Sequence, residues 1–402
     1  MNILYLCDEY PPGRHGGIGT AVQLLARGVA KRGHKVVVAG FYDWGYGGPD
    51  EFEDGEVKVY RFRRKLDHAF FSKKESLPVR AAYKLLHLTG IFQLDISSSI
   101  KKYEAFLLDI ISKHEIEIIE QPDFNEYAQY CRKPVYFPRL PLPTVVKLHG
   151  SISYFNKEAG GEPSPVVYNI DHSVLHKADA VSSVSRYTAV KTAAYMDYKS
   201  PIEVLYNGID THLGTSGGKE PGLVVYTGSL VAKKGIYQLM KAWNVVQEQM
   251  PAAKLEVYGK GPVERVQQYL GQAAKASVSF KGHIPRPDLF RRLAAAGAAV
   301  FPSYAECFAL GPMEAMAAGT AVVYSTRTSG PELVEDGVSG LLADPDNIDE
   351  LAEKIIYLLQ DREANERIAA AGKARVEERF DIRVIAKMNE DFYKAVLSGS
   401  RA

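Results

Sequence analysis

The regular alternation of short apolar runs with helix-like segments constrains the fold of this chain more than any other feature of its sequence. The apolar runs of the first half are NILYLC, KVVVAGF, EIEIIEQ, TVVKLHG and AVSSVS, and those of the second half are LVVYTGS, KLEVYGKG, VSFKGHI, AAVFPS and TAVVYST. Such runs are typical of buried strands, and segments 20–32 and 236–249 between them carry apolar residues at helical spacing. Strands that alternate with helices predict an α/β chain with a parallel, doubly wound sheet in each half.

Two segments interrupt this alternation. Residues 43–56 are rich in glycine and acids and predict a loop, which is followed by VKVYRF as a further strand. Residues 199–222 contain a proline, an Asn-Gly turn and the run GTSGGKEPG without apolar periodicity, and they predict a linker. We therefore expect two Rossmann-like domains, residues 1–205 and 206–381, facing a central cleft in which ligands bind beyond the carboxyl ends of the strands.

Composition excludes several classes of function. With 402 residues, of which 46% are hydrophobic, the chain is long enough to bury a core in each of two domains. A net charge of +1 gives no overall attraction to nucleic acid, and the sequence shows no recognition motif, so we expect no nucleic-acid partner. Three cysteines without a Cys-x-x-Cys pair argue against a zinc cluster and for a reducing compartment.

The sequence gives no sign of export or of membrane insertion. Its apolar runs fall short of the roughly 20 residues of a membrane span, and the run at the N-terminus is too short for a signal peptide. We therefore expect a cytoplasmic protein. In RFRRKLDHAFFSKKE, basic residues are interleaved with Phe62, Phe70 and Phe71. This segment is either a solvated loop and helix face, or residues 61–74 make peripheral contact with anionic lipids at the inner face of the membrane.

The stretch FPSYAECFALGPMEAMAAGT, residues 301–320, places two carboxylates in a turn from a strand to a helix. We expect the helix to begin near Gly311, because Pro312 suits a first helical turn. Glu306 then lies on the loop and Glu314 in the first turn, where an acid is otherwise often only a capping residue. The backbone amides expected to face the same crevice, and suited to a phosphate group, are those of Ala309, Leu310 and Gly311.

A second glycine-rich loop, DEYPPGRHGGIGT, follows the first predicted strand. Gly16, Gly17 and Gly19 allow the backbone to approach a ligand closely at the amino end of a helix, which favours anions. A dinucleotide-binding fingerprint fits badly, because residues 8–15 separate these glycines from the strand and Val22 occupies the third glycine position. A long flexible turn remains as the other interpretation.

The two acids, with seven residues between them, resemble the E-x7-E motif of the retaining glycosyltransferases of family 4 (glycosyl transferases group 1), which have the GT-B fold. Lys234-Gly235, the segment Asn207-Gly208-Ile209-Asp210, VYGKGP and KGHIP resemble further family segments, and the glycine loop resembles that of the family's N-terminal domain. The resemblance is weaker over residues 45–140, which should hold the acceptor site. It also implies that the C-terminal segment 382–402, for which we expect a helix over residues 382–397, crosses back onto the first domain.

The resemblance implies a role for each matching residue. Glu306 would hold the hydroxyls of the donor sugar and support the charge at its anomeric carbon, and Glu314 would bind the ribose. Lys234 and the helix amides would neutralise the diphosphate. His149, otherwise a structural histidine at a strand end, would contact the sugar from the first domain, and the backbone near Ile284 would read the base. Further donor-binding positions are Gly16, Gly17, Ser229 and Lys233. No metal and no cofactor are implied.

The chain departs from the family pattern at one point. The family usually has Gly-Arg where this sequence has Gly228-Ser229, so one of two expected diphosphate cations is missing. Either Lys233 or Arg14 replaces it, or the donor binds more weakly or is unusual. The resemblance implies retaining transfer of a sugar from a UDP- or GDP-sugar to an unidentified acceptor, in glycan, glycolipid or glycoconjugate biosynthesis. A nucleotide-sugar 2-epimerase of the same fold and a non-catalytic nucleotide-sugar-binding protein remain as alternatives.

Overall fold

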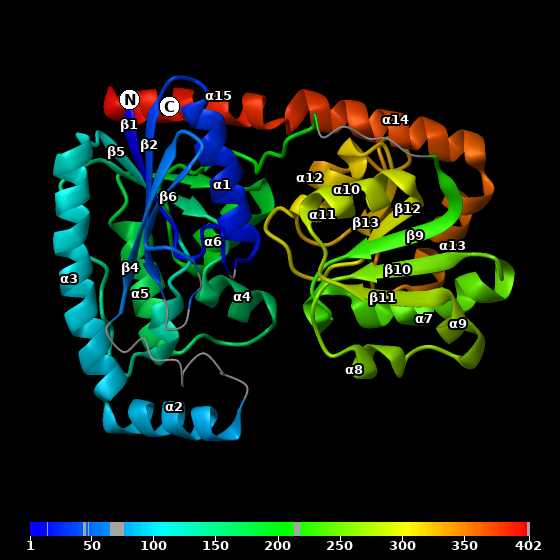
Figure 1. Cartoon of the computed structure of the whole chain (residues 1–402), viewed down its shortest axis with the longest axis horizontal. Coiled ribbons are helices and arrows are strands. Elements are labelled where there is room, and N and C mark those ends of the chain that lie inside the picture. Colours follow the sequence, from blue (N-terminus) through cyan, green and yellow to red (C-terminus); the bar gives the residue numbers. More distant parts are fainter. Residues whose placement is uncertain (14, 43–45, 47, 65–75, 213–217, 400–402) are drawn as a thin grey trace. The chain divides into compact units, whose positions relative to one another are not determined.

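The computed structural model describes residues 1–13, 15–42, 46, 48–64, 76–212 and 218–399 (Figure 1). The chain forms two compact units, one made of Met1–Tyr206 with Ile385–Ala402 and the other of Asn207–Val384. Each unit is built on one sheet with helices packed against it, which confirms the predicted α/β class.

The first unit contains an eight-stranded sheet in the order β3-β4-β2-β1-β5-β6-β7-β8. Neighbouring strands run parallel except for β3, which is antiparallel to β4. The order reverses beside β1, whose neighbours are β2 and β5, as expected for a doubly wound sheet. The strands are β1 (Asn2–Leu6), β2 (Lys35–Tyr42), β3 (Glu51–Asp54), β4 (Val57–Arg63), β5 (Ile118–Pro122), β6 (Thr144–Leu148), β7 (Ala180–Ser183) and β8 (Glu203–Val204).

Helices cover both faces of this sheet. On one face α1 packs through Val22 and Leu25, and on the other α3 packs through Tyr103 and Leu107 (Figure 1). The helices are α1 (Gly17–Ala30), α2 (Leu77–Thr89), α3 (Ile91–His114), the 3-10 helix η2 (Glu126–Tyr130), α4 (Ile152–Glu158), α5 (Pro165–His176), α6 (Arg186–Tyr195) and α15 (Ile382–Leu397).

The C-terminal helix α15 returns to the first unit and has the bounds that the sequence predicted. Ile385 and Tyr393 are buried among the residues that α1 also covers. The Tyr393 hydroxyl donates to Glu120 Oε2 at 2.6 Å, and Lys147 Nζ donates to Asn389 Oδ1 at 2.7 Å. These buried polar pairs fix the helix to β5 and β6, because buried polar groups left without partners would be costly.

The second unit contains a six-stranded, entirely parallel sheet in the order β11-β10-β9-β12-β13-β14. Its strands are β9 (Glu220–Thr227), β10 (Lys254–Tyr258), β11 (Val278–Gly282), β12 (Ala296–Phe301), β13 (Ala321–Ser325) and β14 (Leu341–Ala343). Its helices are η3 (Ala232–Lys234), α7 (Ile236–Gln249), α8 (Val263–Gln267), α9 (Gln272–Ser277), α10 (Arg286–Ala295), α11 (Leu310–Ala317), α12 (Gly330–Leu333), α13 (Ile348–Gln360) and α14 (Arg362–Arg379).

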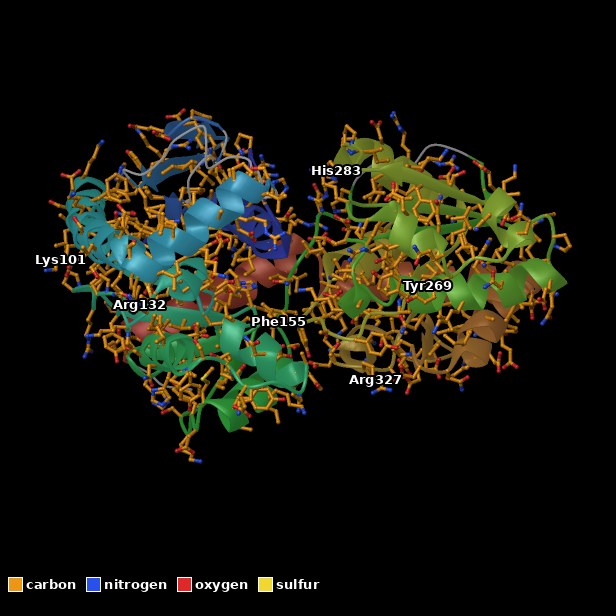
Figure 2. The ribbon with its side chains drawn as sticks, turned by 90° about the horizontal axis from the view of Figure 1, so that it is seen from below. Lys101, Arg132, Phe155, Tyr269, His283 and Arg327 are labelled. Atoms are coloured by element: carbon orange, nitrogen blue, oxygen red, sulfur yellow. The ribbon has the colours of Figure 1, made fainter. Side chains whose placement is uncertain are left out.

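Every residue of the central strand β12 is buried, as a parallel strand covered on both faces requires. The side chain of Trp243 on α7 is fully buried in the core of this unit, and its Nε1 donates to Ser277 Oγ at 2.9 Å. Tyr237, also on α7, has its ring 5.0 Å from that of Tyr269, which follows α8 (Figure 2). The apolar runs of the sequence therefore form the interior of the second unit.

The structure corrects three predictions of local structure. Residues 43–56 are not all loop, because β3 pairs with β4 through a turn at Gly55, where φ is +64°. Residues 199–222 are not all linker, because β8 and the start of β9 lie within them. The sequence analysis also missed β14. These strands are short or rich in charge and proline, so they carry little apolar signal.

The segment 61–74 lies only partly within the described residues. Arg61 and Arg64 are 4% and 3% exposed, and Phe62 packs against the core at Phe41. The predicted contact with lipids is therefore wrong for Arg61 and Arg64. For Phe62, which is partly buried, it stays a prediction. Arg63 is paired with Asp50. Residues 65–74, which include Phe70 and Phe71, lie outside the described residues. Among the helices that the structure describes, none has the length and apolarity needed to cross a membrane.

Candidate active site

The backbone ties the Lys-Gly turn to the loop that carries the first acid. Gly235 has φ of +67°, and a Cβ atom there would lie 1.7 Å from the carbonyl oxygen of Pro302. The N–H of Tyr304 donates to the carbonyl of Lys233 at 2.8 Å. Because glycine alone permits this approach, the turn after β9 lies directly against the loop after β12.

Lys234 and Glu306 meet at this junction. Lys234 Nζ lies 2.5 Å from Glu306 Oε1, and both side chains are mostly buried. The structure thus brings together two residues that the sequence analysis assigned to one site. Burial of a charge is tolerated when an opposite charge lies beside it, so each residue offsets the cost of burying the other.

Two tyrosines of the neighbouring strands adjoin Glu306, and the sequence analysis did not identify them. Burial, with a smaller effect of the Glu306 charge, raises the pKa of Tyr226 and of Tyr324 far above the ordinary value. Both phenols therefore stay neutral. The Tyr226 hydroxyl donates to the carbonyl of Ser229 at 3.1 Å, which fixes the turn after β9. Ser229 itself is exposed.

Helix α11 presents unpaired amides at its amino end. Ala309 is its N-cap and provides no side-chain cap, and Pro312 has no N–H. Within the described residues, the N–H groups of Ala309, Leu310 and Gly311 make no hydrogen bond. Unpaired N–H groups at a helix amino end attract anions. The amides predicted to bind a phosphate group thus lie at a helix amino end, and phosphate binding there stays a prediction.

The position of Glu314 differs from the prediction. The helix begins at Leu310, one residue before the expected start, so Glu314 lies in its second turn and is not a first-turn acid. Its Oε1 instead lies 2.7 Å from Arg286 Nη2, at the start of α10. Burial raises the pKa of Glu314, and the Arg286 guanidinium opposes that rise.

Arg286 was missed by the sequence analysis, although it directly follows the segment KGHIP. Its Nε atom is buried and makes no hydrogen bond within the part of the chain that the structure describes. Ile284 lies two residues before it, between β11 and α10. The N–H and C=O of Ile284 are likewise without a hydrogen bond among the described residues. Polar groups of this segment therefore remain available to a ligand.

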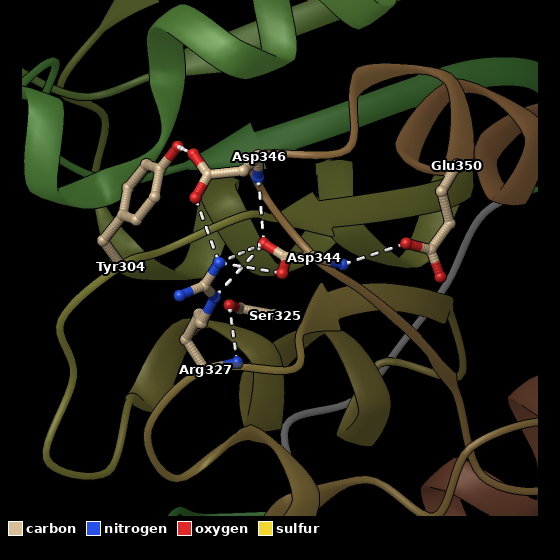
Figure 3. A network of polar contacts seen from close by, with 6 residues as sticks. All are labelled: Tyr304, Ser325, Arg327, Asp344, Asp346 and Glu350. Atoms are coloured by element: carbon tan, nitrogen blue, oxygen red, sulfur yellow. Dashed lines mark hydrogen bonds and ion pairs between the residues drawn. The ribbon is translucent and has the colours of Figure 1, made fainter.

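Loops around this site are held by a second set of charges. Arg327 Nη2 donates to Asp344 Oδ1 at 2.7 Å and to Asp346 Oδ2 at 3.0 Å, and the Tyr304 hydroxyl donates to Asp346 Oδ1 at 2.5 Å (Figure 3). These residues follow β12, β13 and β14. Tyr304 precedes Glu306 by two positions, so the network restrains the loop that carries the acid.

In the first unit, the glycine loop differs from the prediction. Helix α1 begins at Gly17, earlier than expected, with Gly16 as its N-cap. The Glu9 carboxylate accepts from Gly16 N at 3.1 Å and from Gly19 N at 2.8 Å. A Cβ atom at Gly19 would lie 2.0 Å from the Glu9 carbonyl oxygen. These two glycines therefore serve contact with Glu9, and their amides are not open to an anion.

His149 directly follows β6 in the same unit and is 8% exposed. Its backbone N–H donates to Asp123 Oδ1 at 2.8 Å, and Gly150 N donates to Asp123 Oδ2 at 3.2 Å. Burial, helped by the charge of Lys147, lowers the pKa of His149 to about 3. The imidazole is therefore neutral near pH 7. Burial raises the pKa of the Asp123 carboxyl, a residue that the sequence analysis missed, to about 7.

The structure leaves some predicted positions undecided. Gly17 has open space around its Cα, and Lys233 is exposed. Arg14, proposed as a substitute for the missing arginine, lies outside the described residues.

Two protein families match the chain. Residues 215–375 match Glycosyl transferases group 1, and residues 15–213 match Glycosyltransferase Family 4. Glycogen synthase of Mycobacterium tuberculosis is 26% identical over 418 residues, which cover 100% of this chain and 96% of that protein.

Solved structures agree with the fold. Sucrose-phosphate synthase from Thermosynechococcus elongatus has a TM-score of 0.75 and 20% sequence identity, with 100% of each chain covered. HepE of Anabaena, solved in complex with UDP and glucose, has a TM-score of 0.65 and 20% identity, with 98% of this chain and 100% of that one covered. These likenesses confirm the predicted GT-B fold.

Proposed function

Since the chain belongs to the glycosyltransferases of family 4, enzymes that use a nucleotide sugar and retain the anomeric configuration, we propose that it transfers a hexose from a UDP- or GDP-sugar to an acceptor hydroxyl. The pathway proposed is the synthesis of a glycan, glycolipid or glycoconjugate. The observation that carries this proposal is the Lys234–Glu306 pair of the second unit. An ammonium and a carboxylate in contact offer one group for the diphosphate and one for the sugar.

The diphosphate is assigned to Lys234 and to the unpaired amides of residues 309–311. Both are positive groups held by the fold before a ligand arrives, so they stabilise the charge of a leaving diphosphate without reorganisation. Lys233 and Ser229, in and beside the Lys-Gly turn, are assigned supporting contacts. The carboxylate of Glu306 then holds hydroxyls of the donor sugar and stabilises positive charge at the anomeric carbon.

The nucleoside is assigned to the segment from Ile284 to Arg286 and to Glu314. A buried carboxyl tends to become protonated, and the guanidinium of Arg286 favours the ionised form that accepts hydrogen bonds from ribose hydroxyls. Arg286 is therefore a positioning residue. The backbone groups of Ile284 read the base edge. The bound UDP in the Anabaena HepE structure favours uridine as the first base to test.

In the first unit, His149 is assigned a contact with the donor sugar, and Gly17 a supporting one. Because the imidazole is neutral, it can exchange hydrogen bonds with a hydroxyl but holds no proton to give as an acid. In the transfer step, the bond from the anomeric carbon to the phosphate oxygen breaks and a bond to the acceptor oxygen forms. The acceptor proton passes to the departing phosphate oxygen, which requires attack from the same face.

Two measurements test the proposal. A thermal-shift panel of UDP, GDP, ADP and CMP identifies the nucleotide, since a ligand at about 100 times its Kd adds roughly 2.7 kcal/mol of stability. The matching nucleotide sugar is then incubated with the protein and candidate acceptors. Nucleotide release that rises with acceptor supports transfer. Release together with an altered sugar and no acceptor product would favour the epimerase, and binding without release would favour a binding protein.

A further inference from the structure

A helical surface of the first unit exposes large apolar side chains. It consists of α2 and the first turn of α3, here called the α2–α3 face. Five of its side chains are between 44% and 79% exposed, namely Leu77, Leu85, Leu88, Ile91 and Leu94. Fully burying one such side chain lowers the free energy of the protein by about 1.5–3 kcal/mol. Several of them exposed together therefore make burial against a partner favourable. Contiguous apolar surface of this kind marks an interaction site.

The leucines point away from the unit because the opposite sides of both helices are anchored. Val79 on α2 and Phe92 and Ile96 on α3 are 2%, 1% and 0% exposed. Leu85 and Leu88 are three residues apart, as one face of a helix requires. The main neighbour of α2 among the described elements is α3, and Figure 1 shows α2 below the first sheet. The apolar face of α2 is therefore not a core face of this unit.

Positive charge surrounds these leucines. Arg80 and Lys84 are exposed on α2 itself. Arg132 Nη1 donates to the carbonyl of Leu88 at 3.0 Å, and the Lys133 N–H donates to Gln93 Oε1 at 3.0 Å. Figure 2 looks onto α2 from below, with Arg132 labelled beside it. The loop of Arg132 and Lys133 thus adds two cations to the α2–α3 face.

The sequence of α2 and of the start of α3 contains few acids. Asp95 is the single acid in the sequence from residue 76 to residue 103. It is partly buried, and burial raises its pKa, with an opposing effect of Arg64. The α2–α3 face is therefore apolar and basic at once.

We propose that the α2–α3 face docks on an anionic lipid bilayer, with the leucines at the boundary of the acyl chains and the four cations among the headgroups. An amphipathic helix with basic residues beside its apolar face binds in this manner. A second copy of the chain fits the charges less well. In an isologous contact the cations of one copy would meet the same cations of the other, with one partly buried acid to pair them. The proposal concerns location and is independent of the donor chemistry.

The test is flotation of the full chain with vesicles of phosphatidylcholine alone or mixed with phosphatidylglycerol. We expect binding to the mixed vesicles, weakened by salt, and little binding to phosphatidylcholine. The double variant Lys84→Gln/Leu88→Gln should lower the partition coefficient by about tenfold or more, because it removes one cation and one inserted side chain. The matched control is Lys31→Gln/Val190→Gln, which removes an exposed cation and an exposed apolar side chain elsewhere on the same unit.

Thermal unfolding checks that each variant is folded, and Arg80→Gln/Leu85→Gln provides a second pair if the first is not. Equal partitioning of wild type and both folded variants would overturn the proposal, as would binding that ignores phosphatidylglycerol or an absence of binding. A dimer in solution that Leu88→Gln dissociates, without vesicle binding by the wild type, would instead assign the face to a second copy.

Discussion

The ion pair of Lys234 and Glu306 determines what charge the site presents to a donor. If Lys234 is replaced by alanine, the carboxylate is left facing the diphosphate without its cation. We expect Lys234→Ala to lower kcat/KM by about 10²-fold or more, because the lost ammonium stabilises the leaving group. Steady-state nucleotide release measures this. Lys241→Ala, at an exposed position of α7, is the control. An unchanged kcat/KM in Lys234→Ala would remove this lysine from the site.

The pair of Arg286 and Glu314 predicts a pH effect on nucleotide binding. Burial raises the pKa of Glu314 and the guanidinium opposes the rise, so in Arg286→Gln the pKa should rise further. A carboxyl with a higher pKa takes up its proton at a higher pH as acid is added. A protonated Glu314 accepts ribose hydroxyls poorly. The affinity of Arg286→Gln for the nucleotide should therefore fall more steeply than that of the wild type when the pH is lowered from a neutral to an acidic value.

Isothermal titration at both pH values measures this effect. Arg291→Gln is a matched control, because Arg291 lies on the same helix in an exposed pair with Asp288. Parallel pH profiles for the wild type and Arg286→Gln would show that Arg286 does not set the ionisation of Glu314.

At the residue scale, spacing within the sequence identifies the acids but not their partners. Glu306 and Glu314 follow from a local motif. Arg286 and Asp123 do not, because each acts through a contact with another segment of the chain. Such contacts depend on which strand ends lie side by side. The order of strands in a sheet cannot be predicted from local periodicity.

At the scale of elements, Gly235 links η3, α7 and the loop after β12. Alanine there would adopt a left-handed φ and would also meet the Pro302 carbonyl. We expect Gly235→Ala to destabilise the chain by several kcal/mol. About 1–2 kcal/mol comes from the strain of the left-handed φ, and the rest is the cost of displacing the backbone at Pro302. Urea unfolding measures the loss, and nucleotide release should fall with it, because Lys234 and Glu306 are moved apart.

Gly337→Ala separates the two contributions. Gly337 also has a left-handed φ, of +74°, but nothing lies within 4 Å of an added Cβ atom. This variant should lose only about 1–2 kcal/mol and keep its activity. If the two variants lose the same free energy of unfolding, the contact with Pro302 adds nothing to the strain of the left-handed φ.

Elements with a strong apolar signal were predicted well. Helices α7 and α15 have the predicted bounds, and β12 contains the predicted buried run 298–301 and begins two residues before it. Three of the four residues of β3 are acidic, so nothing in its pattern indicated a strand. Helix α1 begins earlier than predicted. The Glu9 carboxylate accepts hydrogen bonds from backbone amides at the start of the helix, and this allows glycines within the first turn.

At the scale of the whole molecule, the net charge does not show where charges cluster on the surface. The net charge of +1 argued against a nucleic-acid partner, yet the α2–α3 face combines cations with exposed leucines. The two-sheet architecture was predictable because the main strands of both sheets carry their own apolar signal. The motifs that indicated the family lie within the two matched segments. Lys234, Glu306 and Glu314 lie in residues 215–375, and the segment 207–210 lies in residues 15–213.

The last prediction concerns the stereochemistry of the whole reaction. Inversion needs a general base within hydrogen-bond reach of the attacking hydroxyl, on the side opposite the leaving nucleotide. Glu306 and Glu314 both belong to the unit that holds the proposed diphosphate amides, so we assign them to the nucleotide side. The leaving phosphate oxygen then takes the proton, and the anomeric configuration is retained. Glu306→Gln should therefore reduce turnover far more than UDP binding, whereas Glu314→Ala should weaken nucleotide binding directly. NMR of the product from an α-linked donor should show an α linkage, and a β linkage would contradict the mechanism.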